Sequence, residues 1–235
     1  EENKEEVLSY EYDKASRLVK ENNKKLNFTK IYTYDEIGNI QSVKEYEYQD
    51  ETVLRTTTTN TYDNFGRLIQ HNDSVIEYDL NHNPTVYEDK TIQFDKVKNL
   101  IQYNATTYTY DTNGSRREKI TNGVTTTYIT INNKIIEEKN INYHIQYYYG
   151  INGIVGFQYN GEEYTYIKDL TGNVIGILDE EGNIVAKYIY DGWGNHKVID
   201  NTNQENKEEN FIGNINPFRY KGYYYDVETG LFLVS

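Results

Sequence analysis

The sequence is constrained most by a short unit that recurs along its whole length. An aromatic residue directly followed by Asp occurs eight times, and three consecutive intervals between copies are 16 residues long. A fixed short period indicates one supersecondary unit that is repeated and stacked on its neighbours. The copies are Tyr12-Asp13, Tyr34-Asp35, Tyr62-Asp63, Tyr78-Asp79, Phe94-Asp95, Tyr110-Asp111, Tyr190-Asp191 and Tyr225-Asp226.

Each position of the unit has a mechanical role in a β-hairpin. Aromatic residues two positions apart, such as Tyr32 and Tyr34, share one face of a strand. An Asp at the end of a strand accepts hydrogen bonds from backbone N–H groups two residues on, which starts a turn. A glycine three residues later supplies a positive φ, and the apolar residue after it opens the returning strand. The glycines at this position are Gly38, Gly66, Gly114 and Gly194, and two copies without the aromatic residue are Asp169 with Gly172 and Asp179 with Gly182.

The unit predicts an all-β fold made of consecutive antiparallel hairpins in a curved, right-twisted sheet. We expect a strand content well above the usual ~20–25% and a helix content below ~10%. Two copies depart from the pattern, because Pro84 and Arg116 occupy the apolar position. Pro84 should begin its strand, lie at an edge or mark a bulge, since it cannot donate to a ladder. The polar segment 200–210 has no apolar period and is predicted to be a mobile loop.

Charge and composition argue against several classes of function. The formal net charge is -13, which opposes binding to nucleic acid and to anionic membranes. No segment has the ~18 consecutive apolar residues that a membrane-spanning helix needs, so we predict no membrane insertion. Cysteine is absent, and the four histidines are widely separated. We therefore expect no catalytic residues, no cofactor site and no enzyme activity.

Two parts of the sequence contain oxygen donors that could bind a metal ion. Asp79, Asn81 and Asn83 match the odd positions of a calcium-binding EF-hand loop, but Pro84 replaces the turn glycine and Lys90 the bidentate acid. That site is rejected. The turns that begin at Asp169 and Asp179 offer oxygen donors for a weak calcium site, but a recurring Asp is better explained by its turn role. The predicted outcome is no metal.

Tyrosine leaves two interpretations open. The chain contains 26 tyrosines, which can pack across strands or form exposed rows that stack on sugar rings. The first use is structural. The second would make the chain an adhesion module that binds a glycan or a protein receptor.

The recurring unit resembles the YD repeat of RHS/YD-repeat proteins. The stretches Tyr164–Asn195 and Asn216–Leu231 are similar to the RHS-associated core that closes such arrays. The resemblance implies two regions, a YD-repeat array over 1–146 and core repeats over 147–235 that include the polar loop. Members of the family include bacterial polymorphic toxins, the C component of Tc toxins and teneurins. Their repeats wind into a hollow β-shell, which in bacterial members encloses a toxic C-terminal domain.

The resemblance implies a structural function, namely a section of shell wall that encapsulates a C-terminal toxic cargo in a secreted or cell-surface protein. The chain begins without Met, so we expect the rest of a longer parent chain to be its main partner. Self-cleavage, which is common in the family, is not inferred for this sequence. We also expect self-association through unpaired strand edges, above all the stretch Gly222–Tyr225 with the apolar run 231–234.

Overall fold

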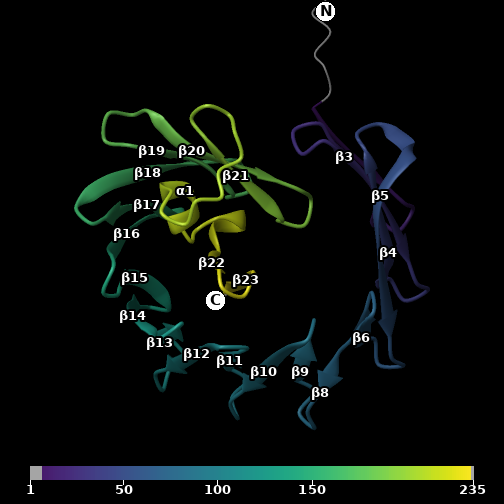
Figure 1. The fold of residues 1–235 in the computed structure, drawn as a ribbon, viewed down its shortest axis with the longest axis horizontal. Coiled ribbons are helices and arrows are strands. Elements are labelled where there is room, and N and C mark those ends of the chain that lie inside the picture. Colours follow the sequence, from purple (N-terminus) through teal and green to yellow (C-terminus); the bar gives the residue numbers. More distant parts are fainter. Residues whose placement is uncertain (1–6, 234–235) are drawn as a thin grey trace, which may run out of the picture. The chain divides into compact units, whose positions relative to one another are not determined.

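The computed structural model describes residues 7–233, and the fold is almost entirely β (Figure 1). Strands account for 58% of the residues and helix for 3%, which confirms the all-β prediction. The strands form a seven-stranded sheet in the order β1 to β7, a fourteen-stranded sheet from β8 to β21, and a separate pair, β22 and β23. The described strands pair antiparallel with their neighbours in the chain, as expected for consecutive hairpins.

The strands are β1 (Leu8–Tyr12), β2 (Leu18–Asn23), β3 (Phe28–Tyr34), β4 (Ile40–Glu47), β5 (Asp50–Tyr62), β6 (Leu68–His71), β7 (Ser74–Val75), β8 (Glu77–Tyr78), β9 (Pro84–Tyr87), β10 (Lys90–Phe94), β11 (Leu100–Tyr103), β12 (Thr106–Tyr110), β13 (Arg116–Thr121), β14 (Val124–Ile131), β15 (Lys134–Lys139), β16 (His144–Gly150), β17 (Gly153–Tyr159), β18 (Glu162–Lys168), β19 (Val174–Leu178), β20 (Ile184–Tyr190), β21 (His196–Asp200), β22 (Tyr224–Asp226) and β23 (Leu231–Leu233). The helical elements are α1 (Ile212–Ile215) and the 3-10 turn η1 (Tyr220–Gly222).

Contacts divide the chain into two compact units. Unit 1 comprises residues 1–91 and 191–193, and unit 2 comprises 92–190 and 194–235. The motif-based division between 146 and 147 follows a different criterion and stays a prediction.

The turn that begins at Asp63 represents the repeated hairpin. Its carboxylate Oδ1 accepts hydrogen bonds from the backbone N–H groups of Phe65 and Arg67, at 2.9 and 3.0 Å. The Gly66 N–H donates to the Asp63 carbonyl, and Gly66 has φ +77°. The carboxylate and the left-handed residue therefore close the turn together. The turns that start at Asp13, Asp35, Asp79, Asp95, Asp111, Asp169 and Asp179 repeat this backbone pattern.

Residues other than glycine adopt the same conformation where the unit lacks glycine. Ser16, His82 and Lys98 stand three residues after an Asp and have φ of 61°, 66° and 70°. The backbone path is thus a property of the repeated hairpin. Glycine lowers the strain of the left-handed conformation but is not required for it.

The turn aspartates give the fold a predictable response to acid. Hydrogen bonds from the backbone and side chain of Asn83 lower the pKa of Asp79, and the hydroxyl of Thr202 with the backbone of Gln204 lowers the pKa of Asp200. A carboxyl whose pKa is lower in the folded state stabilises it above the unfolded pKa of about 3.9, and loses that effect as the pH falls through the folded pKa. We therefore expect the urea midpoint to fall below about pH 4. Asp79→Asn should make the dependence shallower, and an unchanged slope would contradict this account.

Tyrosines near the ends of strands join several hairpins to the hairpin before them. The Tyr34 hydroxyl donates to the Leu18 carbonyl at 2.6 Å, and Tyr78 donates to Leu68 at 2.7 Å. The accepting residue lies at the beginning of its strand, two positions before the first residue that pairs with the next strand. Leu18, for example, precedes Lys20, which pairs with Ile31. The phenol thus satisfies a carbonyl that the ladder leaves out. The same contact joins Tyr62 to Ile40, Tyr110 to Leu100, Tyr149 to Ile135 and Tyr190 to Val174.

Tyr78→Phe tests this link. Removing the hydroxyl leaves the Leu68 carbonyl without its donor while the ring stays in place, so the free energy of unfolding of unit 1 should fall by about 1 kcal/mol. Urea unfolding measures the change. Tyr12→Phe is the matched control, since Tyr12 is 60% exposed and precedes the first link. Equal shifts in the two variants would contradict a specific role of the hydroxyl.

The departures noted in the sequence have distinct outcomes. Pro84 begins β9, as predicted for a residue without an N–H. The register shift between Glu77 and Tyr78, where Tyr78 pairs with Pro84, recurs in hairpins without proline, such as between Thr109 and Tyr110. The segment 200–210, predicted to be a mobile loop, begins with a further Asp turn. Asp200 accepts hydrogen bonds from Thr202 and Gln204, and Asn203 has φ 64°. The sequence pattern missed this copy because it carries neither the aromatic residue nor the glycine.

The predicted C-terminal edge differs from expectation. Residues 222–225 were expected to end the hairpin array with an unpaired edge, but β22 is bonded on both sides. It pairs with β23, and the Tyr225 N–H donates to the Pro217 carbonyl at 2.8 Å. Residues 222–225 are therefore not an unpaired edge, because the preceding segment folds back beside β22. Among the described strands β23 pairs only with β22, and self-association through this hairpin stays a prediction. Val234, the last residue of the apolar run, lies outside the described residues.

The core of unit 2 lies on the concave side of its sheet. Ile145, Phe157, Val174 and Ile177 are completely buried there. Aromatic rings fill the space between the sheet and the C-terminal residues, and Phe218 contacts Tyr147 edge-on at 4.8 Å between ring centroids. Such pairs contribute about 0.5–1.5 kcal/mol each beyond the burial of their area. The buried tyrosines of this cluster are Tyr128, Tyr147, Tyr166, Tyr188 and Tyr224.

Candidate functional site

The C-terminal segment, defined here as residues 211–233, lies inside the curve of the sheet in unit 2. Figure 1 shows α1, β22 and β23 on the concave side of the strands from β14 to β21. The Val174 N–H donates to the Arg219 carbonyl at 3.0 Å, so β19 hydrogen-bonds directly to this segment. The contacts that hold the segment form the most elaborate polar site among the described residues.

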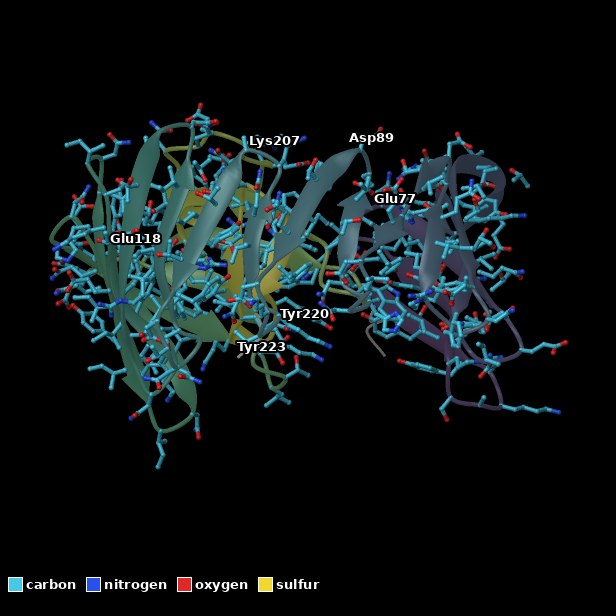
Figure 2. The ribbon with its side chains drawn as sticks, turned by 90° about the horizontal axis from the view of Figure 1, so that it is seen from below. Glu77, Asp89, Glu118, Lys207, Tyr220 and Tyr223 are labelled. Atoms are coloured by element: carbon cyan, nitrogen blue, oxygen red, sulfur yellow. The ribbon has the colours of Figure 1, made fainter. Side chains whose placement is uncertain are left out.

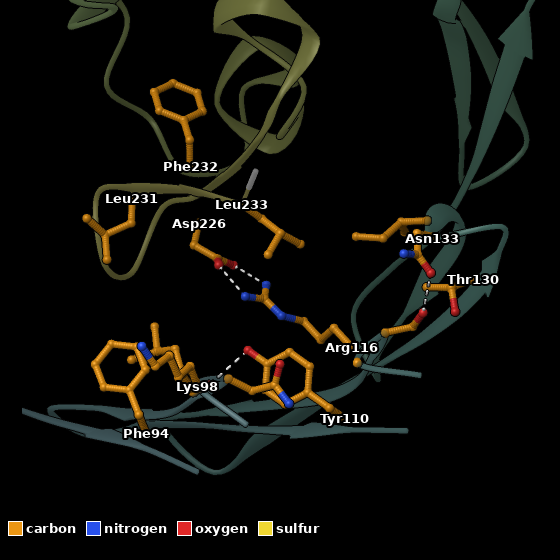
Figure 3. Close-up of a pocket in the computed structure, with 15 residues that line it drawn as sticks. Phe94, Lys98, Tyr110, Arg116, Thr130, Asn133, Asp226, Leu231, Phe232 and Leu233 are labelled. Carbon is orange, nitrogen blue, oxygen red and sulfur yellow. Dashed lines mark hydrogen bonds and ion pairs between the residues drawn. The ribbon is translucent and has the colours of Figure 1, made fainter. Parts of the chain in front are cut away.

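The centre of the site is a buried ion pair between Arg116 and Asp226 (Figure 3). Both side chains are almost completely buried, at 2% and 4% exposure, and two parallel contacts of 2.8 Å join the guanidinium to the carboxylate. The Arg116 guanidinium also lies over the Tyr108 ring, 4.4 Å from its centroid. Lys119 adds a second cation, 3.6 Å from Asp226 and 2.8 Å from Glu228. Bidentate geometry makes this among the stronger kinds of ion pair.

A buried carboxyl group lies next to the ion pair. Glu138 is 2% exposed and accepts a short hydrogen bond from the Tyr224 hydroxyl. Burial raises the pKa of Glu138, although the nearby Lys119 ammonium and the Tyr224 hydroxyl oppose that change. Burial and the charge of Glu138 together raise the pKa of Tyr224 well above its ordinary value. Tyr224 therefore stays protonated and keeps donating to Glu138 at physiological pH.

Asn216 organises the other end of the segment. It is completely buried. Its Oδ1 accepts from the Tyr166 hydroxyl at 2.6 Å, and its Nδ2 donates to the Tyr188 hydroxyl and to the Phe218 carbonyl at 2.9 and 2.7 Å. A buried amide with all these partners specifies one position of the segment against the sheet.

Arg219 holds the irregular backbone of the same segment. Its Nε donates to the Asn216 carbonyl at 3.1 Å, and its Nη2 donates to the Asn214 carbonyl at 2.9 Å. Its guanidinium lies 4.6 Å from the centroid of Tyr225. These carbonyls lie outside any sheet ladder, so the arginine replaces the partners that a ladder would provide.

The residues singled out in the sequence take different places. The turn aspartates and glycines lie at separate hairpin ends, and the structure does not gather them into one site. Asp226 is the exception, because its carboxylate binds Arg116 and not its own turn. In unit 1, the Asp191 carboxylate accepts from Trp193 N–H and from Lys30 Nζ, both at 2.9 Å. Phe94, Tyr110 and Gly114 line a cavity of about 350 Å³ beside Asp226 (Figure 3).

The chemistry of the site is that of a structural anchor. The charges at its centre are paired, and no cluster of three or more His, Asp or Glu residues suited to a metal occurs between residues 7 and 233. The site thus has the chemistry to hold a segment in place against the sheet.

Sequence reasoning missed Lys119, Glu138 and Asn216 as members of this site. Arg116 was noticed only as a charged residue at an apolar position of the unit, and that departure was the available signal. An arginine where the pattern asks for an apolar residue points to a buried anionic partner, because an unpaired buried charge is too costly.

Comparisons with known proteins give a limited match. No family model matches the chain. It is 35% identical over 124 residues to the tRNA3(Ser)-specific nuclease WapA of Bacillus spizizenii, and 34% identical over 124 residues to the tRNA nuclease WapA of Bacillus subtilis strain 168. Each match covers 51% of this chain, and the chain spans only 5% of the length of these relatives.

Two solved structures align with most of the chain at low similarity. The TcdB2-TccC3 crystal structure has a TM-score of 0.47 at 15% identity, over 96% of this chain and 16% of that chain. The Photorhabdus luminescens Tc holotoxin pore has a TM-score of 0.39 at 12% identity, over 96% of this chain and 17% of that chain. Among residues 7–233, no helix has the length and apolar character to cross a bilayer.

Proposed function

We propose that this chain is a section of the wall of an RHS/YD-repeat toxin, and that the wall encapsulates a C-terminal toxic cargo. The observation that carries the proposal lies in unit 2, where the hairpin strands hold a later segment of the same chain on their concave side through the buried Arg116–Asp226 ion pair. The similarity to part of the WapA nucleases supports it. The role is structural and non-enzymatic. We further propose that the intact protein is secreted or displayed at the cell surface.

The activity in the relatives' names is not proposed for this chain. The match covers 5% of the nuclease, and a net charge of -13 repels the phosphates of RNA. The proposed partner is the rest of the parent chain, with cargo held on the concave side.

The alternative, an adhesion module that binds a glycan or receptor through tyrosines, has less support. Most tyrosines in unit 2 face its interior, and the large exposed hydrophobic residues in the described part of the chain include only Tyr10, Tyr12 and Tyr148 as tyrosines. These three do not make a continuous row for sugar stacking. Self-association is retained as a proposal for the remaining strand edges, such as that of β1.

Immunoblotting of the source organism tests the proposal. An antibody raised against the exposed 201–210 segment should detect a protein several times larger than 27.7 kDa in the secreted or cell-surface fraction. Limited proteolysis of that protein should leave the sequence after the repeats intact, and Asp226→Ala should expose it by weakening the wall. A 27.7 kDa antigen would contradict the wall proposal. Equal cleavage of the two proteins would contradict encapsulation.

A further inference from the structure

Unit 2 contains a second cavity, of about 250 Å³, that the anchor does not use. It lies between the ends of three hairpins, β14–β15, β16–β17 and β18–β19, and the C-terminal segment. Its lining includes Lys134, Lys168 and Lys221 together with Tyr149, Phe218 and Tyr223. Tyr223, which is labelled in Figure 2, is joined to Tyr220 by a hydrogen bond from its N–H to the Tyr220 carbonyl at 2.9 Å.

The charge of this cavity is opposite to that of the chain. Three lysines line it, and no Asp or Glu does, although the chain carries 37 acids against 24 bases. Among the described residues, none of these lysines forms an ion pair with a carboxylate. Asp169 follows Lys168 directly, but its carboxylate is bonded within its own turn by Thr171 and Asn173.

The contrast with the first cavity is informative. There the cation of Arg116 is neutralised by Asp226, so that cavity holds its own counter-charge. Cations that line one cavity repel each other, and the repulsion grows where water is partly displaced. An anion from outside the chain is the missing counter-charge.

The three lysines make local contacts, and the Lys221 Nζ lies 5.3 Å from the centroid of the Tyr220 ring, which is not part of the lining. The Lys168 Nζ donates to the Asn152 carbonyl at 3.2 Å, and the Lys134 Nζ lies 5.1 Å from the centroid of the Tyr149 ring. Lys221 has a left-handed backbone, with φ 52°, and its N–H donates to Asn173 Oδ1 at 2.8 Å. A left-handed residue that is not glycine stores strain, and it lies here outside any hairpin turn.

We propose that this cavity binds a small multivalent oxyanion, of the phosphate or polycarboxylate class. Lysine ammonium groups bind such anions as point charges. Tyr149 and Phe218 add aromatic rings to the lining, while Lys134 and Lys221 are exposed to solvent. The site is independent of the wall function proposed above, because it requires only the folded unit 2.

The test is a titration of the full chain with inorganic phosphate, pyrophosphate and citrate, with sodium chloride at matched ionic strength as the reference. At about ten times the dissociation constant, binding should raise the melting temperature by about 3 °C. Isothermal titration calorimetry gives the stoichiometry, which should be one. The variant Lys134→Gln/Lys168→Gln/Lys221→Gln should lose both signals.

A matched control separates a site from general charge effects. Lys187→Gln/Lys197→Gln/Lys207→Gln removes the same charge from residues outside the cavity and should keep the response to phosphate. Lys187 bonds to Asn203, while Lys197 and Lys207 pair with Glu205. Equal responses in the two triple variants, or no response beyond that to chloride in the unaltered chain, would overturn the proposal.

Discussion

Replacing Asp226 by alanine is expected to lower the free energy of unfolding of unit 2 by about 3–5 kcal/mol, the usual effect of removing one partner of a buried ion pair. The loss is large because Arg116 is 2% exposed and stays charged at any ordinary pH. Among the described residues, Asp226 is the carboxylate that pairs with the guanidinium, so without it the desolvation of Arg116 is no longer compensated. The Lys119 ammonium also loses one of its two acids.

Urea unfolding of three variants tests the origin of this loss. Asp179→Ala, at an exposed turn, is the control and should cost much less than Asp226→Ala, because it removes hydrogen bonds without stranding a buried charge. Arg116→Leu combined with Asp226→Leu should recover much of the stability, since replacing both partners removes the uncompensated charge. A double variant as unstable as Asp226→Ala would show that the ion pair is not the cause.

Gly156→Ala should have a comparable effect, about 3 kcal/mol, although it adds only one methyl group. Gly156 lies inside β17, between its partners Tyr148 and Thr165. A Cβ built at this position overlaps the backbone carbonyl oxygen of Tyr164 and lies 3.3 Å from the Thr165 Cα. Since these are backbone atoms of the neighbouring strand, the clash cannot be relieved by a change of rotamer, and the sheet has to shift.

Gly150→Ala is the matched control for this substitution. Gly150 ends the neighbouring strand β16, and its added Cβ meets only a methyl group of Val155, at 3.0 Å. Val155 is 39% exposed, so its side chain can move aside at little cost. We expect a change below about 1 kcal/mol for Gly150→Ala in thermal or urea unfolding. Similar losses at both positions would mean that the close approach of the β17 and β18 backbones is not what requires glycine.

The hairpins were predictable because their causes are local. An Asp such as Asp63, the positive φ three residues later and the returning Leu68 all lie within six residues, so their pattern repeats in the sequence and indicates the fold class. The Asp200 turn was missed since Asn203 can replace glycine in the left-handed conformation, which leaves no glycine to mark it.

The anchor was not predictable in the same way because its partners are distant in the chain. Arg116 and Asp226 are separated by 110 positions, and Glu138 and Tyr224 by 86. No periodic pattern links such residues. The requirement for glycine at 156 depends likewise on a neighbouring strand and not on the conformation of Gly156 itself. Sequence patterns therefore predicted the hairpins. The interior contacts that fix how the C-terminal segment packs against them could be identified only from the three-dimensional structure.

The hydroxyl of each linking tyrosine reaches the carbonyl that opens a strand of the preceding unit, as Tyr34 reaches Leu18 and Tyr110 reaches Leu100. This contact restricts how many residues the repeat array can gain or lose without breaking its links. Duplication or loss of one entire unit preserves a tyrosine for every such carbonyl. Gain or loss of a single residue within a strand turns the tyrosine to the opposite face and breaks its link. Recombination is therefore expected to lengthen or shorten the array in whole units.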